Sequence, residues 1–266
     1  MWKGTPTPQS GMGIGKFIST GEFDVEGNAM SLLYDDNFIG QTSLTGKNYA
    51  FYRLFSGNTK VVNAKNMILP ATTLAVNCYQ NMFDGCTSLT TAPELPATTL
   101  ADNCYYQMFQ NCTSLISAPA LPATNLAKYC YEYMFYNCTG ITSAPTLPAT
   151  TLADYCYKGM YCSCTSLTKA PELRATTLTN NCYSRMFEGC SGLTIAPELP
   201  ATTLANNCYE GMFFACSGLT TAPELPATTL ATNCYYNMFY GCTSLTSAPE
   251  LPATTLVEGC YRQMFF

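Results

Sequence analysis

The sequence predicts an α/β repeat solenoid, in which short parallel strands and short helices stack side by side behind a small β-rich N-terminal cap. A 26-residue unit recurs without insertion or deletion, and a fixed period of about 20–50 residues is typical of stacked coils. Only 11% of the residues are charged while 47% are hydrophobic, which favours one continuous core. The unit begins at Leu69, Leu95, Leu121, Leu147, Leu173, Leu199, Leu225 and Leu251.

Each unit is expected to contain a short helix that is buried on one side. In the second unit, apolar residues from Cys104 to Cys112 follow the spacing i, i+1, i+4, i+5 and i+8, which covers an arc of about 140° on a helix. Thr98 or Thr99 is available as the N-cap of this helix. Asp102, three residues after Thr99, adds the acidic member of a capping box.

A strand of three or four residues is expected after this helix. Residues Leu115 to Ala118 are followed by Pro119, and proline is confined to strand ends because it donates no ladder hydrogen bond. Strands of adjacent units would pair in parallel. Leu95 and Pro96 would turn the chain back toward the next helix.

The repeats divide the chain into four parts. Residues 1–15 are expected to be a linker, residues 16–50 an N-terminal β-rich cap, and residues 51–68 a degenerate transition repeat. Residues 69–266 hold seven full 26-residue repeats and a truncated eighth, which stops at Phe266 within its expected helix. The chain start lacks the apolar stretch of a secretory signal peptide. These two features predict either a protein that stays inside the cell or a fragment of a longer protein.

Fifteen of the sixteen cysteines occupy two positions of the repeat, and we expect them to form two structural ladders of small buried side chains. Their spacings of eight and eighteen residues, in a chain without histidine, argue against a metal site. Disulfides between neighbouring coils would be within reach at ~4.8 Å, but parallel side chains disfavour them. One row comprises Cys78, Cys104, Cys130, Cys156, Cys182, Cys208, Cys234 and Cys260, and the other Cys86, Cys112, Cys138, Cys164, Cys190, Cys216 and Cys242.

The remaining cysteine, Cys162, departs from both rows. It takes the place of Asp84 and Gln110 in other units, on the side of the expected helix that would face solvent. We therefore expect an exposed thiol without a necessary function.

Charge and composition exclude several classes of function. A net charge of -5 with only 12 scattered cations argues against nucleic acid as a partner. No apolar run reaches the ~18 residues of a membrane span. Without histidine, neither a Ser-His-Asp nor a Cys-His arrangement can form. We expect no enzyme activity, no cofactor and a monomeric protein.

Two surfaces are candidates for binding. The first combines an acidic row with a threonine row in which hydroxyl groups recur at the period of the repeat, although strand propensity alone also explains threonine. The second consists of aromatic residues on the outer side of the expected helix, either exposed as anchors or partly buried between neighbouring helices. The first surface contains Glu172, Glu198, Glu224, Glu250, Thr168, Thr194, Thr220 and Thr246, and the second Tyr106, Tyr133, Tyr136, Phe214, Tyr236 and Tyr240.

The unit CYxxMFxxCTSLTxAPxLPATTL resembles the BspA-like leucine-rich repeats of bacterial surface proteins, especially those of gut Bacteroidetes. Met82-Phe83, Cys86 and Ser88-Leu89 carry the resemblance, which covers about residues 50 to 266. It implies a leucine-rich-repeat-like stack, display at the cell surface or secretion, and adhesion to host matrix proteins or other bacteria.

The leading hypothesis is therefore a non-enzymatic module that binds a protein or glycan through the surface of its repeats. One alternative is a structural spacer or a targeting array for another domain, since uniform copies are also what a spacer of defined length requires. A receptor-binding component of a phage or prophage is a further alternative.

Overall fold

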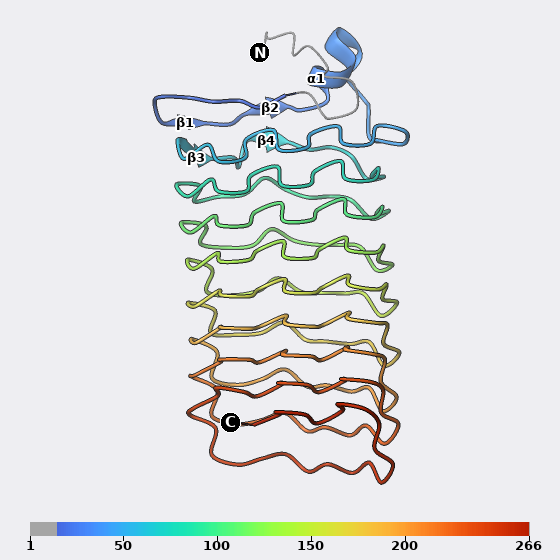
Figure 1. Ribbon diagram of the computed structural model, residues 1–266. Helices are drawn as coiled ribbons and strands as arrows, with labels where there is room; N and C mark the ends of the chain where they lie inside the picture. The colour runs from blue at the N-terminus through green and yellow to red at the C-terminus, as the bar shows by residue number, and fades with distance from the viewer. Residues whose placement is uncertain (1–14, 266) are drawn as a thin grey trace.

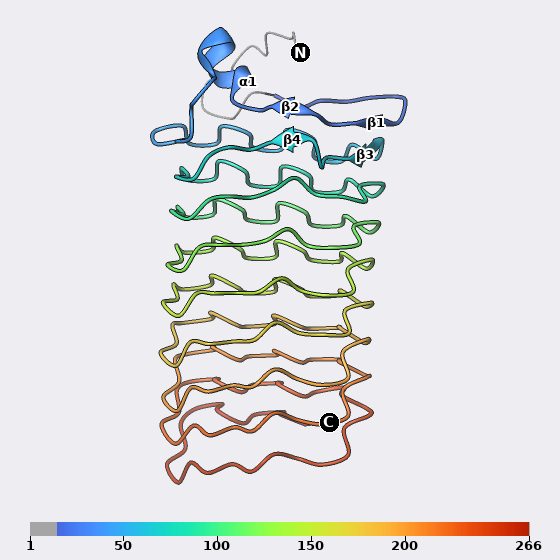
Figure 2. The same cartoon turned by 180° about the vertical axis from the view of Figure 1, so that it is seen from behind.

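The computed structural model describes residues 15–265 as a stack of coils, one coil for each repeat unit. The stack runs from the N-terminal cap at one end to the C-terminus at the other (Figure 1). We number the units 1 to 7 from Leu69 to Leu225. Each coil has two long sides. The side on which the chain makes repeated sharp bends lies in front in Figure 1 and is here called the turn face. The smoother side lies in front in Figure 2 and is called the return face.

The turn face is formed by one ribbon from each unit, which we call the turn ribbon. The return face is formed by the segment that leads from one turn ribbon to the next. The turn ribbons of units 1 to 7 comprise residues 75–86, 101–112, 127–138, 153–164, 179–190, 205–216 and 231–242.

The regular secondary structure of the described residues lies in the first part of the chain. The first coil pairs in parallel with the segment above it at two places. The elements are β1 (Phe23–Asp24), β2 (Gly27–Asn28), α1 (Ser31–Tyr34), η1 (Asp35–Asn37), β3 (Val61–Asn63) and β4 (Met67–Ile68), with β1 paired to β3 and β2 to β4. The expected cap region therefore contains a helical turn as well as strands. The expected linker, apart from Gly15, lies outside the described residues.

The prediction of a helix in each unit was wrong. The turn ribbon is a series of overlapping β-turns, in which an amide hydrogen bonds to the carbonyl three residues before it, as from Met82 to Tyr79 at 3.2 Å. Turns of this series have a residue with positive φ at their third position, including Asn77 (55°), Asn81 (54°) and Gly85 (73°). A positive φ at this position is the signature of a type II turn.

The apolar spacing misled the helix prediction because it fits a period of four as well as a period of 3.6. Cys78, Met82 and Cys86 are all buried at intervals of four residues. Each of them follows a left-handed residue, and asparagine and glycine adopt that conformation at the lowest cost. Asparagine or glycine occupies most of the left-handed positions of the turn ribbons, and the recurrence of these two residue types was the signal for turns.

Alternate amides of the turn ribbon donate hydrogen bonds to a neighbouring coil. Within unit 1, the amides of Tyr79, Asn81 and Phe83 donate to carbonyls of the next coil at 2.8–3.0 Å, while the amides between them close the turns. Every second amide is therefore satisfied only by the neighbouring coil. The backbone of one coil cannot complete its hydrogen bonding alone, in agreement with a stack held together by its neighbours.

The expected helix cap was wrong for the same reason. Thr99 forms a parallel bridge with Thr73 of the preceding unit and caps no helix. The Asp102 carboxylate accepts a hydrogen bond from the backbone amide of Lys128 at 3.0 Å. An acidic side chain predicted to act within its own unit instead links two coils.

The expected strand is present only as isolated parallel bridges. Ser143 pairs with Lys169, and Ile195 with Thr221, each across one repeat period. The direction of pairing agrees with the prediction, but the pairing does not extend into regular strands. Downstream, residues 93–97 alternate between buried and exposed, which is the pattern of an extended chain with one face on the core.

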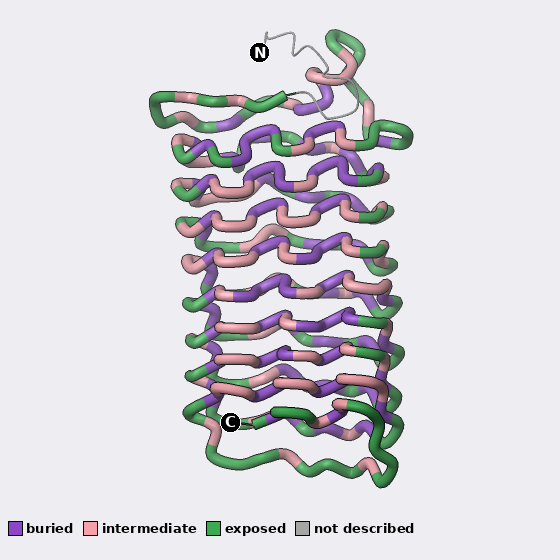
Figure 3. The backbone as a smooth tube through the Cα atoms, in the orientation of Figure 1, coloured by how far each residue is buried: buried purple, intermediate pink, exposed green. Residues whose placement is uncertain are grey.

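Two columns of stacked aromatic rings occupy the core. Figure 3 shows that buried stretches of the backbone lie between exposed corners of the coils. Neighbouring ring centroids are 5.4–5.9 Å apart in the first column and 5.2–5.9 Å apart in the second. Stacking of this kind adds to the stabilisation from burial. The first column runs from Phe51 through Tyr79 to Tyr261, and the second from Phe17 through Phe83 to Phe265.

Substitution of Asn103 distinguishes a turn ribbon from a helix. Asn103 has a φ of 55°, so Asn103→Val should lower the free energy of unfolding by about 1–2 kcal/mol because a β-branched residue is strained there. Asn103→Gly should be close to neutral, whereas a glycine within a helix would destabilise by about 0.5–1 kcal/mol. Thermal unfolding of the two variants provides the measurement. A more stable valine variant than glycine variant would contradict the left-handed turn.

Candidate functional site

The acidic row lies exposed on the return face, as do the threonines beside it. Glu172 accepts a hydrogen bond from Arg174 at 2.7 Å, so this member of the row already has a partner. Glu224 and Glu250 line a cavity of about 330 Å³ together with prolines of the same two segments. The structure therefore brings two of the predicted site residues to one cavity.

The threonine row is engaged in hydrogen bonds between coils. The hydroxyl groups of Thr168, Thr220 and Thr246 donate to backbone carbonyls of the preceding unit at 3.2–3.3 Å. Thr194 supplies one of those carbonyls. The donated protons of these hydroxyls are used within the stack, and only their acceptor positions remain for a ligand.

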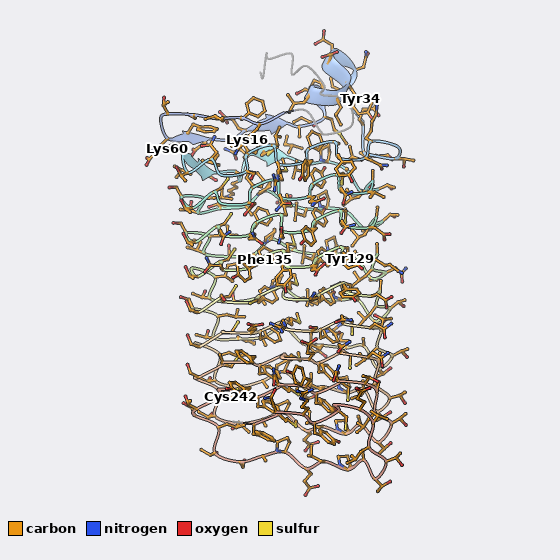
Figure 4. The ribbon with its side chains drawn as sticks, viewed as in Figure 1. Lys16, Tyr34, Lys60, Tyr129, Phe135 and Cys242 are labelled. Carbon is orange, nitrogen blue, oxygen red and sulfur yellow. The ribbon has the colours of Figure 1, made fainter. Side chains whose placement is uncertain are left out.

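The turn face carries a cluster of tyrosines and cations in units 3 to 5. The rings of Tyr129 and Tyr155 stack with centroids 4.7 Å apart. The ammonium group of Lys158 lies over the Tyr155 ring at 5.3 Å and over the Tyr133 ring at 5.8 Å, within the range of cation–π attraction. It also pairs with the buried carboxylate of Glu132 at 3.4 Å. Figure 4 places Tyr129 at the same level of the stack as the core residue Phe135.

A glycine extends this cluster along the stack. Gly159 has a φ of 59°, and a Cβ atom at this position would overlap the Tyr133 ring, so the ring lies against the backbone of the next coil. In the unit after that, Arg185 pairs with Glu188 at 3.2 Å and with Glu210 at 3.3 Å. The tyrosine–cation patch, as we define it, consists of Lys128, Tyr129, Tyr133, Tyr155, Lys158 and Arg185.

The titratable groups of the patch interact with one another and with neighbouring carboxylates. Burial, with the nearby Cys162 and Glu132 groups, raises the pKa of Tyr133 to about 12, so its hydroxyl stays protonated near neutral pH. Burial also raises the pKa of Glu132, and Lys158 opposes that shift. Lys128 pairs with Asp154 of the next unit at 3.8 Å. Each cation thus has a carboxylate in an adjacent coil or turn.

The other predicted aromatic residues also lie on the turn ribbon. Tyr106, Tyr136, Phe214, Tyr236 and Tyr240 are half-buried, packed between coils in agreement with the second of the two interpretations. Their stacking includes the Phe214 and Tyr240 rings, whose centroids are 5.1 Å apart. This pair forms an aromatic contact like that of the patch.

Sequence comparison identifies the repeat. The model of the BspA type leucine rich repeat region matches the chain in six copies, over residues 48–209 and 128–259. The chain belongs to this family of BspA-type leucine-rich repeat proteins. The resemblance stated above for the CYxxMFxxCTSL unit is thereby confirmed. No match was found among curated proteins.

Two crystal structures are similar to this BspA-type protein. One is a leucine-rich repeat protein from Bacteroides ovatus, with 16% sequence identity, a TM-score of 0.39 and coverage of 81% of this chain and 67% of that chain. The other is a leucine rich cell surface protein from Faecalibacterium prausnitzii, with 11% identity, a TM-score of 0.22 and coverage of 72% and 73%.

The cysteines of the BspA-type repeat are all free and buried. In the second row, the thiol of each cysteine donates to the carbonyl of an aromatic residue in the preceding coil, as from Cys112 to Phe83 at 3.1 Å and from Cys216 to Phe187 at 2.9 Å. These thiols therefore act as weak donors between coils as well as small apolar side chains.

The prediction of an exposed thiol at Cys162 was wrong. The residue is only 5% exposed, and its sulfur lies 3.7 Å from the Ser163 hydroxyl. The error follows from the helix prediction, because a helix would have turned this position to solvent while the turn ribbon packs it against neighbouring coils. Burial raises the pKa of Cys162 to about 11.

The described part of the chain offers little for metal chemistry. No group of three or more His, Cys, Asp or Glu residues among residues 15–265 is arranged to hold a metal ion. Within the same range, no helix combines the length and the apolar character needed to cross a membrane.

Sequence reasoning missed the tyrosine–cation patch as a unit. It identified Tyr133 as a candidate, but not Lys158, Arg185 or Gly159, whose backbone lies against the Tyr133 ring. The available signal was the distribution of charge: in units 1 to 7, the cations of the turn ribbons are Lys128, Lys158 and Arg185, in three consecutive units.

Thiol labelling should reveal the burial of all sixteen cysteines. Burial raises the pKa of Cys162 to about 11 and that of Cys78 to about 12, so the thiolate forms of these two residues, which are the reactive species, are scarce. At pH 8 a disulfide reagent should label the folded protein far more slowly than protein in guanidinium, where all sixteen thiols react. Rapid labelling that Cys162→Ser abolishes would show instead that this thiol is accessible.

Proposed function

We propose that this protein is a non-enzymatic protein-binding module of the bacterial surface, which binds a partner protein through the tyrosine–cation patch. Membership of the BspA-type family supports a role in protein interaction. The observation that carries the choice of surface is the packing of Lys158, which lies over the rings of Tyr133 and Tyr155 and pairs with Glu132.

A pre-ordered patch suits binding for an energetic reason. Immobilising a flexible side chain at an interface costs about 0.5–1.5 kcal/mol. Lys158 is already held in the free protein by two rings and a carboxylate, and Arg185 by two carboxylates. Tyrosine and arginine are also the residue types enriched among binding hot spots. The patch therefore combines suitable residues with a reduced cost of ordering.

The patch also gives the array a distinct position along its length. Most units repeat the same groups, so a partner that contacts only repeated groups could bind in several registers. Gly159 and Arg185 occupy one repeat position in consecutive units, where unit 2 has Gln107 and unit 6 has Gly211. This combination marks one location on the turn face.

Binding measurements with two matched variants test this function. The full chain should bind at least one member of a panel of extracellular-matrix proteins, mucin and intact bacteria. Tyr129→Ala/Tyr155→Ala should weaken that binding by about 30-fold or more, as loss of a hot spot of about 2 kcal/mol does. Phe214→Ala/Tyr240→Ala removes the other stacked pair of the same face and should leave affinity within about threefold.

The competing site on the return face has its own variant. Changing Glu172, Glu198, Glu224 and Glu250 to glutamine should leave binding intact. Loss of binding in this variant, with binding retained in the Tyr129/Tyr155 variant, would transfer the function to the acidic row. Absence of binding to every member of the panel would favour a structural spacer. Thermal melts of all variants would separate loss of binding from loss of folding.

A further inference from the structure

We infer that the tyrosine–cation patch recognises an acidic segment of its partner protein. This inference rests on the proposed function and adds the chemistry of the partner. It follows from the depth at which the charges of the patch lie.

The cations of the patch are more exposed than the carboxylates with which they pair. The side chains of Lys128, Lys158 and Arg185 are 59%, 25% and 43% exposed, respectively. Their carboxylate partners Asp154 and Glu132 are 31% and 8% exposed. The carboxylates Glu188 and Glu210, which pair with Arg185, are 23% and 20% exposed.

This layering determines which charge a partner meets first. The carboxylate side chains are the less exposed members of these ion pairs, so a partner contacts the side chains of the cations first. Each lysine carries three N–H donors and each arginine five, and the ion pairs of the patch use only one or two donors of each cation. Lys128 and Arg185, the two most exposed cations of the patch, have donors left for a carboxylate of a partner.

The aromatic rings add a second component to the same surface. Tyr129, Tyr133 and Tyr155 are half-buried, so each presents part of its ring or its hydroxyl to solvent. A polypeptide offers apolar side chains for these rings beside carboxylates for the cations. Electrostatic complementarity of this kind raises the association rate and fixes the register of binding.

The charges around the patch are balanced in number: the turn ribbons of units 3 to 5 hold three cations and three carboxylates, Glu132, Asp154 and Glu188. The net charge of the whole chain is -5, and the acidic row makes the return face unsuited to an acidic partner. On the turn ribbons of units 1 to 7, in contrast, all three cations lie in units 3 to 5. What favours an acidic segment at the patch is therefore the greater exposure of its cations, not an excess of positive charge.

Binding of labelled poly-L-glutamate to the full chain tests the inference. We expect saturable binding that weakens markedly between about 50 and 200 mM salt, because exposed charges are increasingly screened. Lys128→Gln/Arg185→Gln should weaken it by about tenfold or more. Arg174→Gln removes an exposed cation of the return face that is also paired with a glutamate, and should leave the affinity within about twofold.

The single variant Lys128→Gln allows an effect on binding to be measured without an effect on folding. Lys128 is 59% exposed, so its loss should leave the melting temperature unchanged while weakening binding by about threefold. Equal binding by the wild type and both patch variants would overturn the inference. An equal loss in Arg174→Gln would overturn it too, since binding would then depend on overall charge.

Two other experiments test whether the patch instead binds an anionic glycan or a second copy of the chain. Polygalacturonate carries carboxylates on a carbohydrate, and binding of this polymer without poly-L-glutamate would replace a protein partner by an anionic glycan. Self-association in sedimentation experiments, lost in both the patch variant and the acidic-row variant, would identify a second copy of the chain as the occupant. Either result would overturn the inference.

The outcomes also separate this inference from the proposed function. If the Tyr129/Tyr155 variant loses binding to a partner on the panel but poly-L-glutamate is not bound, the patch is a binding site whose partner is not acidic. If that variant binds the panel like the wild type, the proposed function itself fails.

Discussion

The structure depends on a hydrogen-bonding requirement that a single coil cannot meet. In each turn ribbon every second amide points away from its own coil, and its acceptor is a carbonyl about one repeat period further along the chain, as between Tyr79 and Cys104. Buried amides without an acceptor are costly. The coils must therefore stay in register, and this requirement explains why seven units carry neither an insertion nor a deletion.

The same register aligns the side chains of the core. Because equivalent positions lie above one another, the first aromatic residue of each unit stacks on its counterpart to form one column, and the second forms another. The cysteines before and after these aromatic residues fill the spaces that remain, and thiols of the second row donate to carbonyls of the preceding coil. A small residue with a weak donor suits this place better than serine, whose hydroxyl is more costly to bury.

A uniform array gains a specific surface only where its copies differ. The tyrosine–cation patch arises from such differences: a glycine at one left-handed position makes room for the ring of Tyr133, and Arg185 occupies the equivalent position one unit later. The left-handed positions of the turn ribbons hold different residue types in different units, such as Asn103, Tyr155, Gly159 and Arg185. On the turn face of units 3 to 5 the cations are more exposed than the carboxylates with which they pair, while the return face exposes the glutamates of the acidic row.

The sequence by itself determined the period, the stacking of one coil per unit, the family and the identity of the buried residues. Each of these follows from which residues recur and at what spacing. It predicted helices wrongly because the spacing of Cys104, Tyr105, Met108, Phe109 and Cys112 satisfies two backbone geometries, and only the hydrogen bonds to the next coil decide between them. The predicted exposure of Cys162 was wrong for that reason. The patch was not predicted because it depends on contacts between unlike residues of neighbouring coils, such as Lys158 and Tyr133. The period places neighbouring units side by side, but only the tertiary structure decides which of their side chains meet, because that depends on where each side chain extends, as with the Lys158 ammonium group over the Tyr133 ring.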